Sequence, residues 1–156
     1  MIEEVIIREK IKDYFAIHEL VGKRTYRKYG ERAWRFLDYR TLSALLIIRE
    51  GLDRPITVNN WYFGGSMQQR GLRTIVQQMI KNYFYKNKLY LSAHLLGKAV
   101  DFDVQGMTAL EVRNWVLNNQ DLFPFKIRME RDVSWCHLDT IWEAKNPKVY
   151  QFSPPK

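Results

Sequence analysis

Two histidines and one aspartate stand in segments that could bind a metal ion. The run Ser-Ala-His-Leu-Leu-Gly-Lys-Ala-Val-Asp over residues 92–101 places His94 in a predicted loop and Asp101 seven residues later. The run Trp-Cys-His-Leu-Asp over residues 135–139 places His137 in a predicted strand. Two imidazoles and one carboxylate are a sufficient protein ligand set for catalytic zinc, because the fourth position stays open for water. Each histidine alone is more typical of a hydrogen-bonded structural group than of a metal ligand, so the prediction rests on the combination.

Strands are predicted on either side of these residues. In residues 99–104 the apolar side chains occupy one face and Asp101 and Asp103 the polar face, which is the pattern of a half-buried strand. Gly97 allows the chain to turn between His94 and Asp101. Three further strands are predicted, at residues 56–58, 126–130 and 135–140, the last two joined by a turn around Asp132.

Helices are predicted from capping residues and apolar spacing. Asp38 is a candidate N-cap for a core helix that Gly51 would end. Thr108 begins a T-x-x-E capping box that opens a helix to about Asn118. The strongest helical stripe runs over residues 73–84, where apolar side chains recur at i, i+4 spacing.

Length and composition limit the architecture. With 156 residues, of which 46% are hydrophobic, the chain can bury one core but is too short for two ordinary domains. We therefore expect a single domain over residues 1–156, with a loose C-terminal tail from about residue 150. The predicted elements indicate an α+β fold, with a small, largely antiparallel sheet and helices packed on one side. Every apolar run is far shorter than the ~20 residues of a membrane span.

The motifs S-x-H-x-x-G-x-A-x-D and aromatic-x-H-x-D together resemble those of a superfamily of small zinc metallopeptidases that act on peptidoglycan. This superfamily comprises the zinc D-Ala-D-Ala carboxypeptidases, the phage L-alanyl-D-glutamate endolysins and the hedgehog-type domains. The resemblance covers most of the chain from Phe15 to Thr140. It implies a hedgehog/DD-peptidase-like fold, zinc as cofactor and His94, Asp101 and His137 as the zinc ligands.

The same resemblance requires a general base near His137. Many relatives carry E-x-x-H, but here Ser134 occupies the glutamate position. Hedgehog-type members have their glutamate farther upstream, so we expect Glu130 to be the base and keep Asp132 as the alternative. Two polar side chains close to the histidines have expected supporting roles. Asp139 and Ser92 are placed to fix the imidazole rings, and Ser92 is also a candidate contact for substrate.

The expected substrate contacts depart from the family pattern. Many relatives follow the first strand with S-G-Y-R, whose arginine binds a substrate carboxylate, whereas residues 59–62 here read Asn-Asn-Trp-Tyr. Arg70, or alternatively Arg73, could supply the guanidinium. Trp135, with Trp61 and Tyr62, could line the cleft or belong to the core. The choice between carboxypeptidase and endopeptidase stays open.

The chain has a net charge of +8 and a pI near 9.6, with basic residues that look scattered rather than grouped. This balance favours a polyanionic partner such as an anionic cell-wall polymer. Without a nucleic-acid-reading motif, a nucleic-acid partner is the least favoured. The first ten residues carry no export signal, and the single cysteine, Cys136, excludes an intramolecular disulfide.

Three functional hypotheses follow. The first is a zinc peptidase that hydrolyses a bond in the peptidoglycan stem peptide, as phage-type lysins do. We expect such a protein to be made in the cytoplasm without a signal peptide and to act at the cell wall, after holin-type release or from a virion. The second is a catalytically inert, zinc-containing module that binds the cell wall or is structural, as some hedgehog-type domains are. The third, a basic nucleic-acid-binding protein, rests on charge alone.

Overall fold

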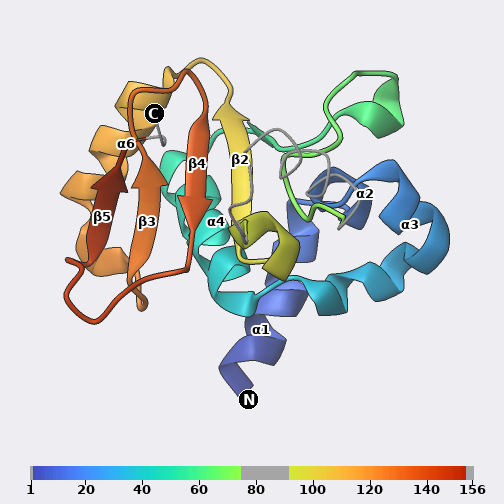
Figure 1. The fold of residues 1–156 in the computed structure, drawn as a ribbon, viewed down its shortest axis with the longest axis horizontal. Helices are drawn as coiled ribbons and strands as arrows, with labels where there is room; N and C mark the ends of the chain where they lie inside the picture. Colours follow the sequence, from blue (N-terminus) through green and yellow to red (C-terminus); the bar gives the residue numbers. More distant parts are fainter. Residues whose placement is uncertain (1, 75–91, 154–156) are drawn as a thin grey trace, which may run out of the picture.

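The computed structural model describes residues 2–74 and 92–153, and it has an α+β fold built on a five-stranded mixed sheet (Figure 1). The α-helices are α1 (Ile2–Lys10), α2 (Ile17–Leu20), α3 (Lys23–Tyr29), α4 (Tyr39–Leu52) and α6 (Ala109–Asn118). The strands are β1 (Ile56–Thr57), β2 (Ala99–Val104), β3 (Ile127–Glu130), β4 (Cys136–Asp139) and β5 (Val149–Phe152). Short 3-10 segments are η1 (Ile11–Asp13), η2 (Gly30–Phe36), η3 (Trp61–Phe63), η4 (Ala93–Leu96) and η5 (Gln120–Leu122).

The strands are arranged in the order β1-β2-β4-β3-β5, with β4 in the centre. The pairs β1/β2, β2/β4 and β4/β3 are antiparallel, in agreement with the prediction of a largely antiparallel sheet, but β5 pairs with β3 in parallel. The expectation of a loose tail from about residue 150 is therefore wrong. Residues 149–152 form the edge strand, and Val149 is buried in the core. Burial of this side chain, together with backbone pairing to β3, holds the segment in place.

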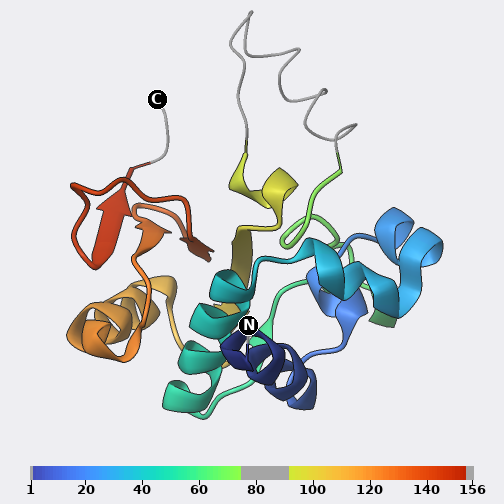
Figure 2. The same ribbon diagram turned by 90° about the horizontal axis from the view of Figure 1, so that it is seen from below.

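The hydrophobic core lies between one face of the sheet and the helices. Figure 2 shows α4 and α6 on the same side of the strands, as the α+β prediction required. The strand side chains on this face are apolar and almost fully buried: Val100, Phe102, Ile127, Met129 and Leu138. Helix α4 is buried on most of its surface and is the central helix of this layer. The opposite face of the sheet is therefore available for polar side chains.

The ends of the helices follow from local chemistry, with one exception. The Asp38 side chain accepts a hydrogen bond from the backbone N–H of Arg40 and caps α4, and the capping box at Thr108 opens α6, as predicted. Gly51 does not end α4, which continues to Leu52. A Cβ atom on Gly51 would lie 2.4 Å from the Trp115 ring, so the glycine allows α6 to pack closely against α4.

Two further sequence predictions concern a helix at residues 73–84 and the absence of membrane spans. The helix predicted at residues 73–84 lies almost entirely outside the described residues. Within residues 2–74 and 92–153, no helix has both the length and the apolar character needed to span a membrane.

Candidate metal centre

The candidate metal centre lies on the sheet face that points away from α4 and α6. In the antiparallel register Asp101 of β2 is directly opposite His137 of β4. The β3/β4 register pairs Met129 with Leu138, and its continuation by one residue places Glu130 opposite His137. Directly opposed residues of antiparallel strands project from the same face. The three central strands therefore present a carboxylate, an imidazole and a second carboxylate in one row.

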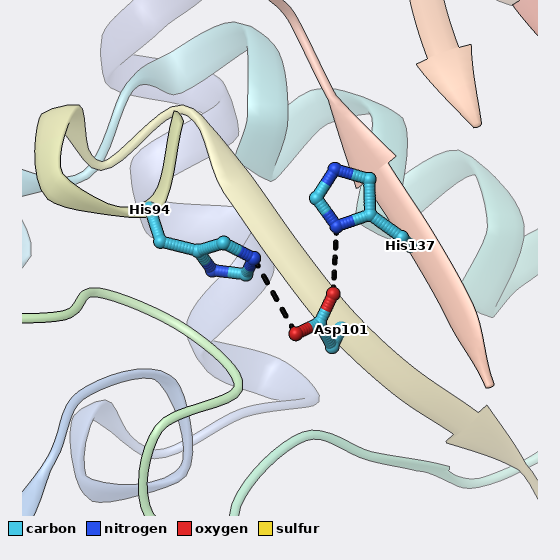
Figure 3. Close-up of side chains that lie close together, drawn as sticks. All are labelled: His94, Asp101 and His137. Carbon is cyan, nitrogen blue, oxygen red and sulfur yellow. Dashed lines mark hydrogen bonds and ion pairs between the residues drawn. The ribbon is translucent and has the colours of Figure 1, made fainter. Parts of the chain in front are cut away.

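His94 completes the group from the loop before β2. The potential ligand atoms of His94, Asp101 and His137 all lie within 4.8 Å of one another, and this group could hold a metal ion. One Asp101 oxygen is 2.7 Å from His137 Nδ1, and the other is 3.4 Å from His94 Nε2 (Figure 3). The side chains converge from three separate segments, as the two sequence motifs predicted.

Each imidazole is oriented by a partner on its far side. His94 Nδ1 is hydrogen-bonded to the carbonyl oxygen of Gly71 at 2.8 Å, and His137 Nε2 to Asp139 Oδ2 at 3.0 Å. One nitrogen of each ring is thereby left to face Asp101. Imidazoles that bind metals are commonly held in this way, with the second nitrogen on a carbonyl or carboxylate. The donor set and its supports fit a divalent ion that accepts nitrogen and oxygen ligands.

The predicted position of Asp101 on a polar strand face requires one correction. That face is not solvent-exposed at Asp101, whose exposed fraction is only 7%, although Asp103 further along β2 is exposed. The difference arises because His94, His137 and Arg73 surround the Asp101 carboxylate, and Arg73 Nη2 donates a hydrogen bond to Oδ2 at 2.9 Å. A buried carboxylate needs such partners.

The electrostatics of the group favour an ionised carboxylate. Burial by itself would raise the pKa of Asp101, but hydrogen bonds from His137 and His94 outweigh it and hold this pKa well below its ordinary value. Burial likewise opposes the charge on His137, yet its hydrogen bonds to Asp101 and Asp139 raise its pKa to about 9. Burial dominates at His94 and lowers the pKa of that imidazole.

Local turns place His94 beside Asp101. Ser92 is buried, and its hydroxyl accepts a hydrogen bond from the backbone N–H of His94 at the start of η4. Its role in the structure is to cap this turn, and the burial of Ser92 leaves it poorly placed to contact substrate. Gly97 adopts φ +66° and turns the chain into β2, as predicted.

The two candidate bases occupy different environments. Glu130 ends β3 in the row with His137, and burial raises the pKa of its carboxyl group. Asp132 lies in the turn after β3 with 70% of its side chain exposed, where its carboxylate accepts a hydrogen bond from Ser153. Of the two, only Glu130 shares a strand row with the metal-binding group.

A cavity of about 370 Å³ opens beside the metal centre. Its lining residues are Met67, Arg70, Asp101, Asp103, Ser134 and Trp135. The predicted substrate contacts Arg70 and Trp135 are therefore brought next to Asp101. Arg70 is paired with Asp103 at 2.5 Å, and Arg73 with Asp101, so each candidate guanidinium already has a carboxylate partner.

Trp61 and Tyr62 do not line this cavity. They join His18, Tyr26 and Phe63 in an aromatic cluster near α2 and α3, in which Tyr62 stacks on His18 with ring centroids 3.9 Å apart. The Trp61 indole N–H donates to the carbonyl of Val21. Neither Trp61 nor Tyr62 lines this cavity or belongs to the hydrophobic core, because Tyr62 is largely exposed and the half-buried Trp61 lies outside the core cluster.

Three supporting residues were not predicted. The Gly71 carbonyl orients His94, Arg128 makes two hydrogen bonds to Asp139, and the Phe152 ring packs edge-on against His137 at 5.8 Å. Arg128 carried a detectable signal, because alternation along β3 places it on the polar face opposite Asp139. The other two depend on contacts between distant segments and had no local signal.

Similarity to known proteins adds no further constraint. The chain matches no protein-family model, no curated protein and no solved structure. The candidate centre therefore stands on its own geometry.

Proposed function

We propose that the protein is a zinc-dependent peptidase that hydrolyses a peptide bond in the peptidoglycan stem, as a phage-type cell-wall lysin does. The observation that carries the proposal is the convergence of His94, Asp101 and His137, with ligand atoms within 4.8 Å of one another. The motifs that resemble those of peptidoglycan metallopeptidases supply these same three residues. Zinc is the expected ion, because two imidazoles and one carboxylate form its common catalytic ligand set.

Glu130 is the proposed general base. When bound, zinc would supply Lewis acidity that activates a water molecule and polarises the scissile carbonyl. The Glu130 carboxylate projects from the same sheet face as His137, where it can accept a proton from the attacking water and deliver it to the leaving amine. Burial raises the pKa of this carboxyl group above the ordinary glutamate value, which makes it a stronger acceptor for the proton of the attacking water. Asp132 is disfavoured because it is exposed in the turn.

The side chains around the cavity favour cleavage within a peptide over release of a C-terminal residue. An exopeptidase needs a cation that is free to bind the terminal carboxylate of its substrate. Among the described residues that line the cavity, Arg70 is the only cation, and it is engaged by Asp103. Trp135 provides an apolar wall for the peptide. We therefore favour an endopeptidase.

The test combines metal analysis with two matched carboxylate variants. The wild-type protein is expected to purify with about one zinc per chain and to clear cell walls in a zymogram unless a chelator is present. Glu130→Gln should retain zinc and lose roughly 10²- to 10⁴-fold in turnover, the usual contribution of a general base. Asp132→Asn is the control and should keep its activity, and His94→Ala should lose both zinc and activity.

The outcomes separate the proposal from its alternatives. A zinc-loaded wild-type protein without activity on any wall preparation would indicate the inert cell-wall module. A protein that binds no zinc would exclude both the zinc peptidase and the inert zinc-containing module. Normal turnover of Glu130→Gln would show that the assigned base is wrong. Mass analysis of the released muropeptides would then identify the bond that is cut.

A further inference from the structure

A basic surface is formed by α3 and η2, away from the metal centre. Its members are the exposed cations of these two segments: Lys23, Arg24, Arg27, Lys28, Arg32 and Arg35. The only acid among residues 22–37 is Glu31, so this stretch carries a net +5 of the chain's net +8. The impression of scattered basic residues is therefore wrong. Figure 1 shows α3 at the end of the molecule opposite β5 and α6.

Helical geometry gathers four of these cations on one side of α3. At about 100° per residue, Lys23, Arg24, Arg27 and Lys28 fall within an arc of roughly 140°. Thr25, which is buried, and the half-buried tyrosines of α3 occupy the remaining circumference and attach the helix to the protein. The cationic side therefore faces solvent.

These cations lack the carboxylate partners that cations elsewhere in the fold have. Within residues 2–74 and 92–153, none of the six forms an ion pair, whereas Arg8, Lys10 and Lys12 on α1 and η1 each pair with a glutamate. The charges within α3 also destabilise the helix. Lys23/Arg27 and Arg24/Lys28 are like-charge pairs at i, i+4, and the first turn carries cations where the helix dipole favours anions. A bound anion would relieve both of these unfavourable interactions.

We infer that the basic surface binds a linear polyol-phosphate polymer of the bacterial cell wall and so holds the enzyme on its substrate. This inference rests on the proposed peptidase function, which places the protein at the wall. A run of phosphates is complementary in charge to this group of cations, none of which has a carboxylate partner in the described part of the chain. The exposed Tyr62 ring contacts Tyr26 on another side of α3, so the arc itself offers its contacts to phosphate rather than to bases.

The experiment measures binding of poly(glycerol phosphate), isolated free of peptidoglycan, by titration calorimetry. The test variant is the triple substitution Arg24→Gln, Arg27→Gln and Lys28→Gln. The control is Lys12→Gln, Lys145→Gln and Lys148→Gln, which removes the same charge from other parts of the surface. The test variant should raise Kd about tenfold, equivalent to about 1.4 kcal/mol, while the control leaves Kd within about twofold.

Each other outcome would overturn the inference. Equal weakening in both triple variants would mean that net charge alone acts. An unchanged Kd in the test variant would mean that the basic surface is not used. Tighter binding to an oligothymidylate of matched phosphate number, or to phosphatidylglycerol vesicles, would identify a nucleic acid or a membrane as the partner. The assay needs no hydrolysis, and His94→Ala should bind the polymer normally. Failure of the peptidase proposal can thus be recognised separately.

Discussion

The metal centre and the basic surface differ in whether their charged side chains have partners of opposite charge. At the metal centre both aspartates have charged or hydrogen-bonding partners: Asp101 is bound by two histidines and Arg73, and Asp139 by His137 and Arg128. On α3 and η2 six cations face solvent, and no carboxylate in the described part of the chain pairs with them. The first region is buried within the fold, and the second lies on its exterior.

The two arrangements of charge suit different functions. Buried charges must be compensated inside the protein, because an uncompensated one costs several kcal/mol. Compensation also fixes the positions of side chains, which is what metal binding and catalysis require. An exposed cation without a carboxylate partner costs little free energy, because water solvates it. It also remains free to bind a mobile, extended anion. The comparison therefore predicts that substitutions in the two regions change stability in opposite directions.

The largest change is expected from Asp139→Asn. The substitution leaves Arg128 without a charged partner and weakens the hold on His137, so the free energy of unfolding of the metal-free protein should fall by about 2 kcal/mol. Zinc affinity should fall about 10- to 100-fold, as it does when a group that orients a ligand is removed. Urea denaturation and competition with a chromogenic chelator measure the two effects. Asp132→Asn, an exposed carboxylate in a turn, should change stability by less than about 0.5 kcal/mol, and an equal loss in both variants would contradict the comparison.

An intermediate effect concerns the pH dependence of hydrolysis. Burial raises the pKa of Glu130, and a general base works only when it is deprotonated. Activity should therefore fall as pH decreases through this pKa, and the acid limb of kcat/KM should lie above the ordinary glutamate value, with a slope of about tenfold per pH unit. Zinc content measured at each pH distinguishes protonation of Glu130 from loss of the metal. A limb at the ordinary value, with zinc fully retained, would show that Glu130 is not the base.

The smallest effect is expected on α3. Arg27→Gln removes a like-charge neighbour of Lys23, so the free energy of unfolding should rise by a few tenths of a kcal/mol, up to about 0.5. Arg8→Gln is the contrasting variant, because the Arg8 guanidinium pairs with Glu4 and donates to the carbonyls of Trp34 and Leu37. This second substitution should lower stability by about 1 kcal/mol. Destabilisation by Arg27→Gln would indicate that α3 depends on its charge for folding.

Most of the fold that could be predicted depends on local signals. Capping at Asp38 and Thr108 located α4 and α6, and alternation along β2 located the central part of the sheet. The parallel strand β5 was missed, because its four residues carry no local sign of their partners in β3, which lie 22 positions earlier in the sequence. Gly51 was misread for a related reason: its role depends on Trp115, which is distant in sequence.

The residues of the candidate site likewise divide into those with a local signal in the sequence and those that depend on distant segments. His94, Asp101 and His137 were predicted because their motifs place the ligand types at recognisable spacing, and the structure brings them together. The partners that orient them were harder to predict. Asp139 is two residues from His137 and was identified, whereas the Gly71 carbonyl reaches His94 across 23 positions. A backbone carbonyl has no signature in the sequence, so only the folded chain reveals it.

Cys136 gives the strand that carries His137 a built-in reporter. Its side chain belongs to the buried core, and burial raises the pKa of the thiol to about 12. Neighbouring residues of a strand point to opposite faces, so the sulfur is on the far side of β4 from the imidazole and is not a ligand of the same ion. Because a thiol reacts as the thiolate and Cys136 is almost fully buried, alkylation should be slow until the structure opens locally around the start of β4. The rate of alkylation at this one sulfur atom would therefore measure how fast this part of β4 opens, without a probe having to be introduced into the protein.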